Sequence, residues 1–520
     1  MPPRTQRAAV TALAALEFGE HPGVDVERRA RHGALMLSRG ASDVRVHALL
    51  LSGVIAVGYL LWQPPSADLA AALYRAHVGA APFDLSWYAG QHPLSYSVLM
   101  PLLAPAVGVR LLAALSVVCA ATLFASLVPS RRAALWFAAT VAISLGSGRV
   151  TFSLGVAIAL GAALAAERRR VGMGGALAVL SALASPLAGA FLALALVLRH
   201  TRVALAALLP LLVLSLVYPE PGYFPFDASS FWPALAATLT LFVLVRGLEL
   251  RATLVLYALV LIGAAVIHSA LGGNAARFGA LLAGPIALLC LSRRRALVVL
   301  LPLFAYWALQ APVRDVVRAG GDPSVEAAYY APLLGFLHRL PGPFRIEIPF
   351  TASHWEAYRV APSFALARGW ERQLDIGVNH VFYTGSIAPA AYGAWLRDHA
   401  VSYVALPDAR LDYSARGEAQ LIRSGQSYLT PIWVSAHWRV YAVARRAPLA
   451  SSPARMTALS SGAFTLAFDA PGASEVRVRY AGGSCVSRAP AGWTIVRASR
   501  AERLRVDFDL LGARCTPLDG

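Results

Sequence analysis

The sequence predicts a polytopic α-helical membrane bundle that carries a soluble region at its C-terminal end. Between residues 46 and 311, apolar runs alternate with short Arg clusters, and after residue 311 ordinary globular sequence follows to residue 520. The chain is 57% hydrophobic and only 14% charged, and its mean hydropathy is +0.57. This composition is too apolar for a soluble protein of such length.

The Arg clusters indicate which end of each apolar run faces the cytoplasm. Seven Arg residues among the first 45 place the N-terminus inside by the positive-inside rule. Counting runs from there, the clusters near residues 131, 168, 199, 246 and 293 all fall inside, and residues 312–520 fall outside. We therefore expect a multi-pass cell-membrane protein with a cytoplasmic segment 1–45 and about ten spans within 46–311. The expected runs are 46–62, 109–128, 133–146, 150–166, 174–198, 203–218, 231–245, 252–268, 278–291 and 296–311.

One run, 174–198, is interrupted by Ser185 and Pro186 and has Arg residues at both ends. It predicts two short half-helices that dip into the membrane and turn back, which is tolerated where protein covers the backbone.

The net charge of +18 does not indicate nucleic-acid binding. The basic residues are all Arg, and much of their excess lies in cytoplasmic loops, where it sets topology and contacts anionic lipid. The sequence has no GxGxxG after a strand, Walker A, HExxH, CxxC or GxSxG motif. We therefore expect no nucleic-acid partner, and the oligomeric state stays open.

The C-terminal part divides into an extracytoplasmic α/β domain over residues 312–446 and a small β-sandwich over residues 455–520, with a linker at 448–453. Periodicity in the α/β domain predicts strands at 344–350, 401–406 and 432–443 and helices at 388–399 and 414–424. Alternating runs in the sandwich predict strands at 464–468, 476–480, 494–496 and 504–510.

The four cysteines divide between the two regions. Cys119 and Cys290 lie in apolar runs, where we expect small core side chains. Cys485 and Cys515 lie in the outer domain, where an oxidising environment favours a disulfide. Closing a loop of about 30 residues contributes roughly 3 kcal/mol in the chain-entropy model. An unpaired state for both cysteines remains the alternative.

The first outer loop, residues 63–96, is far longer than a connection between adjacent spans requires. Asp68 follows the first span by six residues, so we expect it at the membrane surface, at the height of a lipid head group. The other candidate substrate-binding residues of the loop are Tyr74, Arg75, Asp84, Trp87, Tyr88, Gln91 and His92.

This layout resembles the GT-C glycosyltransferases, a family of polytopic membrane enzymes. The resemblance lies in the topology, the appended outer domain, the segment from Asp68-Leu69 to Tyr74-Arg75, and the run from Trp87 to His92. It implies an inverting transfer of sugar from a polyprenyl-phosphate donor to a cell-envelope glycan or lipid acceptor, with Asp68 as general base. Many members have paired acidic residues here, whereas this chain has Leu69 after Asp68, so use of a divalent metal (Mg or Mn) stays open.

A purely structural interpretation of the same loop competes with this hypothesis. Ser66 and Asp68 both suit the N-cap of a surface helix, and Trp87 and Tyr88 suit interfacial anchors. The Pro-Phe-Asp sequence that ends at Asp84 suits a turn, and His92 suits a loop brace as well as a substrate contact.

Residues from other outer loops are expected near this site. Arg149 and Arg277 lie at the outer side against the topological trend, and a guanidinium binds phosphate with a bidentate fork. Asn274 neighbours Arg277, and Tyr223 lies in an aromatic loop, 221–226, suited to an isoprenoid. The alternatives are snorkelling of the Arg side chains to the interface and packing of the aromatic loop beneath the soluble domain.

A third group of candidates lies in the α/β domain, where Trp, carboxylates and Arg residues gather as in many sugar sites. Its members are His354, Trp355, Glu356, Arg368, Trp370 and Arg372. A salt-bridged interface between this domain and the membrane part is the alternative. His354 and Glu356 alone are too few ligands to predict a metal site.

Three functions are compatible with these features. The first is the GT-C-like glycosyltransferase, the second a transporter or flippase of lipid-linked sugars, and the third a non-catalytic membrane protein of envelope assembly. A transporter is expected to show an inverted repeat or mid-span ionisable residues, and neither is evident in the sequence.

Overall fold

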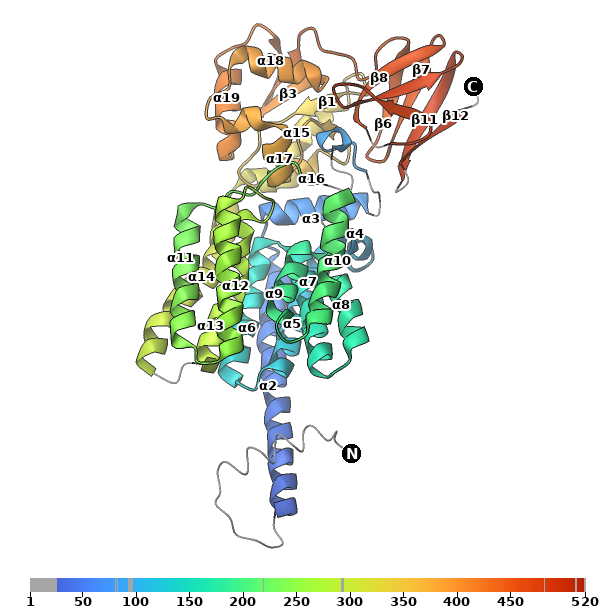
Figure 1. Cartoon of the computed structure of the whole chain (residues 1–520). Helices are drawn as coiled ribbons and strands as arrows, with labels where there is room; N and C mark the ends of the chain where they lie inside the picture. Colours follow the sequence, from blue (N-terminus) through green and yellow to red (C-terminus); the bar gives the residue numbers. More distant parts are fainter. Residues whose placement is uncertain are drawn as a thin grey trace.

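The computed structural model describes residues 26–79, 81, 83–91, 97–217, 219–290, 294–480, 482–509 and 512–518, with the side chains of 26–42, 217, 294 and 295 left out. It consists of a helical bundle, an α/β domain and a β-sandwich (Figure 1). The bundle helices are α2 (Val26–Trp62), α4 (Leu99–Val107), α5 (Val109–Leu127), α6 (Arg131–Ile143), α7 (Val150–Glu167), α8 (Val171–Ala184), α9 (Pro186–Leu196), α10 (Thr201–Val217), α11 (Ala228–Leu244), α12 (Leu248–Val266), α13 (Ala276–Cys290) and α14 (Arg294–Ala319).

Six segments among the described residues are long and apolar enough to cross a membrane, by length and composition. They are Asp43–Trp62, Val109–Leu127, Val150–Glu167, Leu248–Val266, Gly272–Cys290 and Ala296–Ala319. Many of their large apolar side chains face outward, as expected where lipid rather than water surrounds the helices. These features are those of a multi-pass membrane protein. Cys119 and Cys290 are exposed on this surface, so the expectation that they are core residues was wrong.

The bundle has two distinct ends. The N-terminal part of α2 projects from one end, and the C-terminal domains lie at the other, which we call the domain end (Figure 1). Helix α7 begins at the domain end, where Arg149 contacts Asp68 of α3 (Ala67–Val78). Residues 168–170, which follow α7, therefore lie at the opposite end, on the side from which α2 projects. The position of this one Arg cluster, away from the C-terminal domains, agrees with the sequence prediction for residues 168–170.

Helices α8 and α9 are separated by a break at Ser185. The Ser185 side chain caps α9 by accepting a hydrogen bond from the Ala188 N–H, and Pro186 occupies the first position of the helix. A Cβ on Gly189 would lie 2.6 Å from the Ala182 Cβ, so the two short helices fold back closely on each other. The Ser185-Pro186 sequence thus divides the run as expected.

The α/β domain is built on a mixed five-stranded sheet in the order β2-β1-β3-β5-β4. Strand β1 is parallel to β2 and β3, and β5 is antiparallel to β3 and β4. The expected single strand 432–443 is two strands, because the chain reverses where the Ser435 N–H donates to the Trp438 carbonyl. The strands are β1 (Arg345–Glu347), β2 (Ala365–Leu366), β3 (Val401–Pro407), β4 (Leu429–Val434) and β5 (Trp438–Val443), and the helices are α15 (Ala327–Leu337), α16 (Glu356–Arg359), α17 (Arg372–Val378), α18 (Pro389–Asp398) and α19 (Arg416–Arg423).

The last domain has two antiparallel sheets, in the orders β8-β10-β9 and β12-β11-β7-β6, packed around an apolar core that includes Phe464, Val478 and Val506. Three strands were not predicted from the sequence, β6 (Ala454–Leu459), β9 (Val486–Arg488) and β12 (Gly512–Leu518), and all three are edge strands with weak alternation. The other four are β7 (Ala463–Phe468), β8 (Gly472–Arg479), β10 (Trp493–Ala498) and β11 (Glu502–Asp509).

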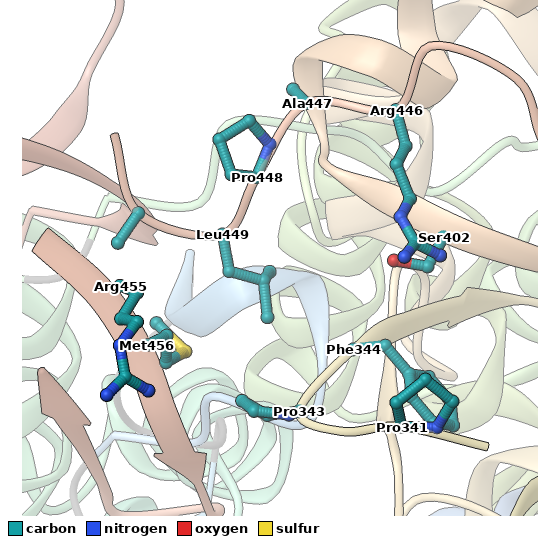
Figure 2. A pocket seen from close by; sticks show the side chains of 11 residues that line it. Pro341, Pro343, Phe344, Ser402, Arg446, Ala447, Pro448, Leu449, Arg455 and Met456 are labelled. Carbon is teal, nitrogen blue, oxygen red and sulfur yellow. The ribbon is translucent and has the colours of Figure 1, made fainter. Parts of the chain in front are cut away.

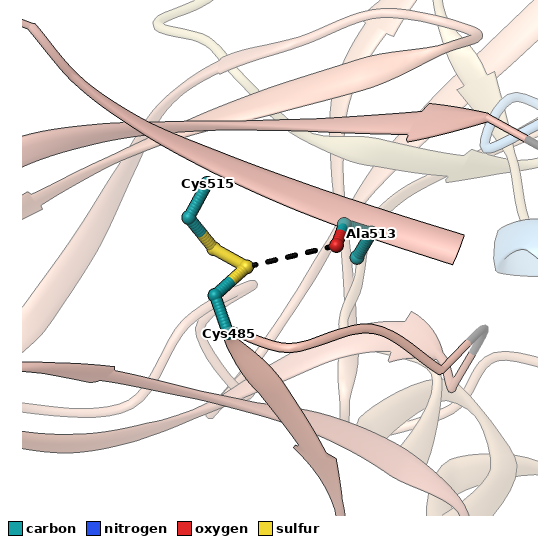
Figure 3. Close-up of a disulfide and its surroundings, with 3 residues drawn as sticks. All are labelled: Cys485, Ala513 and Cys515. Carbon is teal, nitrogen blue, oxygen red and sulfur yellow. Dashed lines mark hydrogen bonds between the residues drawn. A yellow bond between two sulfur atoms is a disulfide. The ribbon is translucent and has the colours of Figure 1, made fainter. Parts of the chain in front are cut away.

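A disulfide joins Cys485 and Cys515, the pairing that the sequence favours, with a Cα–Cα distance of 6.0 Å (Figure 3). Cys485 immediately precedes β9 and Cys515 lies in β12, so the bond ties an edge of one sheet to an edge of the other.

Candidate functional site

Helix α3 lies across the domain end of the bundle, between the bundle and the α/β domain (Figure 1). Its N-cap is Ser66, whose Oγ accepts a hydrogen bond from the Leu69 N–H, and Asp68 lies in the first turn. Gly148, with φ +70°, approaches so closely that a Cβ there would overlap the Ser66 hydroxyl. The start of α3 is therefore fixed against the loop that precedes α7.

Asp68 forms an ion pair with Arg149, whose Nε lies 3.2 Å from the Asp68 Oδ2. Arg149 also has a second carboxylate within reach, because its Nη2 lies 3.9 Å from the Asp315 Oδ2 of α14. The side chains of Asp68, Arg149 and Asp315 are 40%, 23% and 22% exposed. The structure thus places a solvent-accessible carboxylate beside a guanidinium at the domain end, and we call these three residues the Asp68 cluster.

Asp315 was not among the candidates predicted from the sequence. The last apolar run was expected to end at residue 311, whereas α14 continues to Ala319 and carries Asp315 up to Arg149. The sequence signal that could have identified Asp315 was its position, one helical turn beyond the expected end of the last apolar run.

Arg277 lies near the start of α7, and Asn274 precedes it by three residues. The Arg277 guanidinium is 5.8 Å from the centroid of the Phe152 ring. Phe152 lies in the first turn of α7, the helix that begins immediately after Arg149. Asn274 belongs to the short helix η3 (Gly272–Ala275), and its Oδ1 is buried without a hydrogen-bond partner among the described residues. Arg149 and Arg277 therefore both lie near the start of α7.

The aromatic loop containing Tyr223 packs beneath the α/β domain. The Phe224 N–H donates to the Ser269 carbonyl, and the Tyr223 ring lies edge-on to the His268 ring at 4.9 Å. A Cβ on Gly222 would overlap the Gln373 carbonyl of α17. This close backbone contact agrees with the packing interpretation of the loop.

The second half of α3 and the loop after it are buried against the α/β domain. The Tyr74 hydroxyl donates to the Asp84 Oδ1 at 2.8 Å, and the Tyr74 and Trp87 rings stack at 4.3 Å. Trp87 donates from Nε1 to the Ala357 carbonyl, and the Tyr88 hydroxyl donates to a backbone carbonyl in the loop before α17. These aromatic residues join the loop to the domain, so they form neither an exposed substrate surface nor the membrane-interface anchors of the structural interpretation.

The charged members of this junction form a buried group. Arg75 lies 3.9 Å from the Asp84 Oδ2 and 3.4 Å from the Glu371 Oε2. Burial raises the pKa of Asp84 to about 6, against the opposing charge of Arg75. Burial and the neighbouring charge of Glu371 raise the pKa of Glu220 to about 8. Gln91 is half-buried at the end of the short helix that follows Trp87, and His92 lies outside the described residues.

The candidates in the α/β domain divide into two buried clusters. In the first, the His354 ring stacks on Trp370 at 3.3 Å, and its Nε2 lies 3.5 Å from the Asp412 Oδ2. Arg372 holds the same carboxylate with both terminal nitrogens, at 3.1 and 2.8 Å. Burial alone raises the pKa of Asp412, but His354 and Arg372 outweigh it and hold the pKa of this carboxyl well below its usual range. Glu356 accepts from the Thr351 hydroxyl at 2.6 Å.

The second cluster is centred on Arg368, whose side chain is fully enclosed. Its guanidinium pairs with Asp375 at 2.7 Å, Glu418 at 3.3 Å and Glu347 at 3.5 Å. Burial raises the pKa of Glu418 to about 7 and that of Glu347 well above its usual range, with Arg368 acting in the opposite direction.

Neither cluster offers a surface for a sugar. Trp355 is also buried, beneath the Arg359 guanidinium. The expectation that Trp355 and Arg368 contact a donor thus disagrees with their positions, because both side chains are enclosed, and the guanidinium of Arg372, 12% exposed, is held by Asp412. These residues instead stabilise the fold of the domain.

Among the described residues, no three His, Cys, Asp or Glu side chains form a group that could hold a metal ion. No family model, curated protein or solved structure matches the chain.

Proposed function

We propose that this protein is a membrane glycosyltransferase of the GT-C type, which transfers a sugar from a polyprenyl-phosphate donor to a cell-envelope glycan or lipid. The observation that carries the proposal is the Asp68 cluster, an accessible carboxylate paired with a guanidinium where the bundle meets the surface helix α3. The proposed orientation has about ten spans, a cytoplasmic N-terminus and the domain end on the outer side, as the positive-inside rule requires.

In the proposed reaction, the acceptor oxygen attacks the anomeric carbon while Asp68 takes the hydroxyl proton. The bond from that carbon to the phosphate oxygen breaks, and its electron pair leaves with the polyprenyl phosphate. The anomeric configuration is thereby inverted. In this proposal the guanidinium groups of Arg277 and Arg149 offset the charge on the departing phosphate.

The contact between Asp68 and Arg149 alters the roles expected for them. Arg149 orients the Asp68 carboxylate directly, at 3.2 Å. When Asp68 turns toward the acceptor, Asp315 remains as a second anionic partner for the Arg149 guanidinium. Loss of Arg149 is thus expected to lower kcat as well as to weaken donor binding, whereas loss of Arg277 is expected to raise mainly the KM for donor.

The test is sugar transfer by the purified chain in liposomes, using a panel of radiolabelled polyprenyl-phosphate sugars and envelope glycan acceptors. General-base catalysis contributes about 10²–10⁴ in rate, so Asp68→Asn should lose that factor in kcat with little change in donor binding. Asp227→Asn is the matched control, because Asp227 is also an exposed carboxylate at the domain end, just before α11. Full activity of Asp68→Asn would contradict the proposal, and wild-type protein that consumes no donor of the panel would favour the transporter or assembly function.

A further inference from the structure

A groove separates the α/β domain from the β-sandwich, far from the Asp68 cluster. Its main cavity, of about 230 Å³, lies between the linker at 446–450, the start of β6 and the loop before β1 (Figure 2). A second cavity of about 200 Å³ shares Pro343 and Phe344 with the first. Each is smaller than the ~300–1,000 Å³ pockets that enclose a whole drug-sized ligand. Two adjoining small cavities suit successive units of a chain molecule.

Two guanidinium groups flank the main cavity from opposite sides (Figure 2). Arg446 extends from the linker toward Ser402, and its Nη1 lies 3.4 Å from the Tyr403 hydroxyl. Arg455 extends from β6, and both side chains are exposed. Within the described part of the chain, neither pairs with a carboxylate, and their charge is thus available to a ligand.

Some other exposed Arg residues of the sandwich have acidic partners, whereas Arg488, Arg497 and Arg503 have no carboxylate partner among the described residues. Arg505 lies 2.9 Å from Asp507, and Arg514 lies 3.1 Å from Asp509.

The wall between the two Arg residues is apolar. Pro343, Leu449 and Met456 line it, with the Phe344 ring at one side (Figure 2). The partly exposed apolar atoms of Pro343 and Met456 can pack against the C–H faces of sugar rings, while guanidinium forks bind carboxylates bidentately. The combination fits a saccharide that carries acidic groups better than it fits either a neutral sugar or a simple inorganic anion.

We propose that this groove binds an acidic glycan, with Arg446 and Arg455 each engaging a carboxylate of the chain. The assignment of this groove as a docking site for the acceptor rests on the proposed glycosyltransferase function. It predicts that the acceptor is an anionic polymer. Binding itself requires no catalysis, so the site can be tested independently of Asp68.

The experiment measures fluorescence anisotropy of a labelled oligogalacturonate titrated with the full chain in uncharged detergent. Each of Arg446→Gln and Arg455→Gln should weaken binding at least about tenfold, because each removes one charge-assisted contact to a carboxylate. The double variant should abolish measurable binding. Asp68→Asn should bind like the wild type even though it transfers no sugar, which separates this site from the catalytic proposal.

Two controls make the result specific. Arg423→Gln removes the same charge from an exposed position on α19 and should leave binding within twofold. A labelled neutral malto-oligosaccharide should bind at least tenfold more weakly than the oligogalacturonate. The proposal is overturned if the wild type binds no oligogalacturonate, if the Arg423 variant loses as much affinity as the groove variants, or if short-chain polyphosphate binds in the groove while oligogalacturonate does not.

Discussion

Replacement of Arg368 by methionine should destabilise the α/β domain by about 3–5 kcal/mol, the cost of removing one partner from a buried ion pair. Arg368 is fully enclosed and makes contacts of 2.7, 3.3 and 3.5 Å to three carboxylates. Methionine fills much of the volume but leaves Asp375, Glu347 and Glu418 without a cation. Since a domain is typically stable by only 5–15 kcal/mol, the loss should be large enough to measure directly.

The loss of stability caused by Arg368→Met should also depend on pH. The direction of this dependence follows from the pKa of Glu418, which is raised to about 7 in the folded chain from an ordinary 4.5. A carboxyl whose pKa is raised by folding contributes stability that is present below its unfolded pKa and is lost as pH rises through its folded pKa. Without the Arg368 charge, this preference for the protonated form strengthens. Arg368→Met should therefore be closer to the wild type at pH 5 than at pH 7.5.

The assay is urea unfolding of the full chain in detergent, followed by Trp fluorescence at both pH values. Arg423→Met, at an exposed position on α19, is the matched control and should change stability by less than about 0.5 kcal/mol. The reasoning fails if Arg368→Met is as stable as the control, or if its deficit is the same at both pH values.

Four other predictions follow from particular features. Protease added to spheroplasts should release residues 312–520, and protection of that region would contradict the proposed orientation. Replacing Cys485 and Cys515 with serine should cost roughly 3 kcal/mol of sandwich stability in urea unfolding, and reductant should then have no further effect. Gly148→Ala should lower the thermal stability of the chain by about 1–3 kcal/mol and reduce transfer, because a Cβ at φ +70° meets the N-cap of α3. Burial raises the pKa of Asp84 to about 6, so the wild-type free energy of unfolding should fall as pH rises through 6. Asp84→Asn should not show this fall, because an amide does not titrate. A variant with the same pH profile as the wild type would contradict the assignment.

The extent of each helix could be predicted only where hydropathy alone decides it. Apolar runs indicated α5, α7 and α12 closely, because a helix in lipid must be apolar along its length. The polar end of α14 was missed because the prediction followed hydropathy alone. Hydropathy falls after residue 311, but the helix continues to Ala319. Asp315, and with it the second carboxylate near Arg149, was lost with that end.

The roles of the polar residues were harder to predict, because sugar sites and buried ion-pair networks use the same side chains. Trp, Arg and carboxylates near residue 368 suggested a binding surface, yet two of the three acids that enclose Arg368 lie 21 and 50 residues away in the sequence. Local spacing carries no information about partners at such separations. Asp68 and Arg149 were proposed separately for different roles, and only the tertiary fold brings them into contact across 81 residues.

Helix α3 behaves as a rigid rod fixed at both ends to different bodies. Near its start Asp68 pairs with Arg149 of the bundle, and toward its end Arg75 pairs with Glu371 of the α/β domain. Twelve residues make a rod of about 18 Å, so a tilt of about 5° at one end moves the other by about 1.5 Å, enough to make or break a hydrogen bond. We therefore expect that a shift of the α/β domain would move the Asp68 carboxylate relative to the bundle.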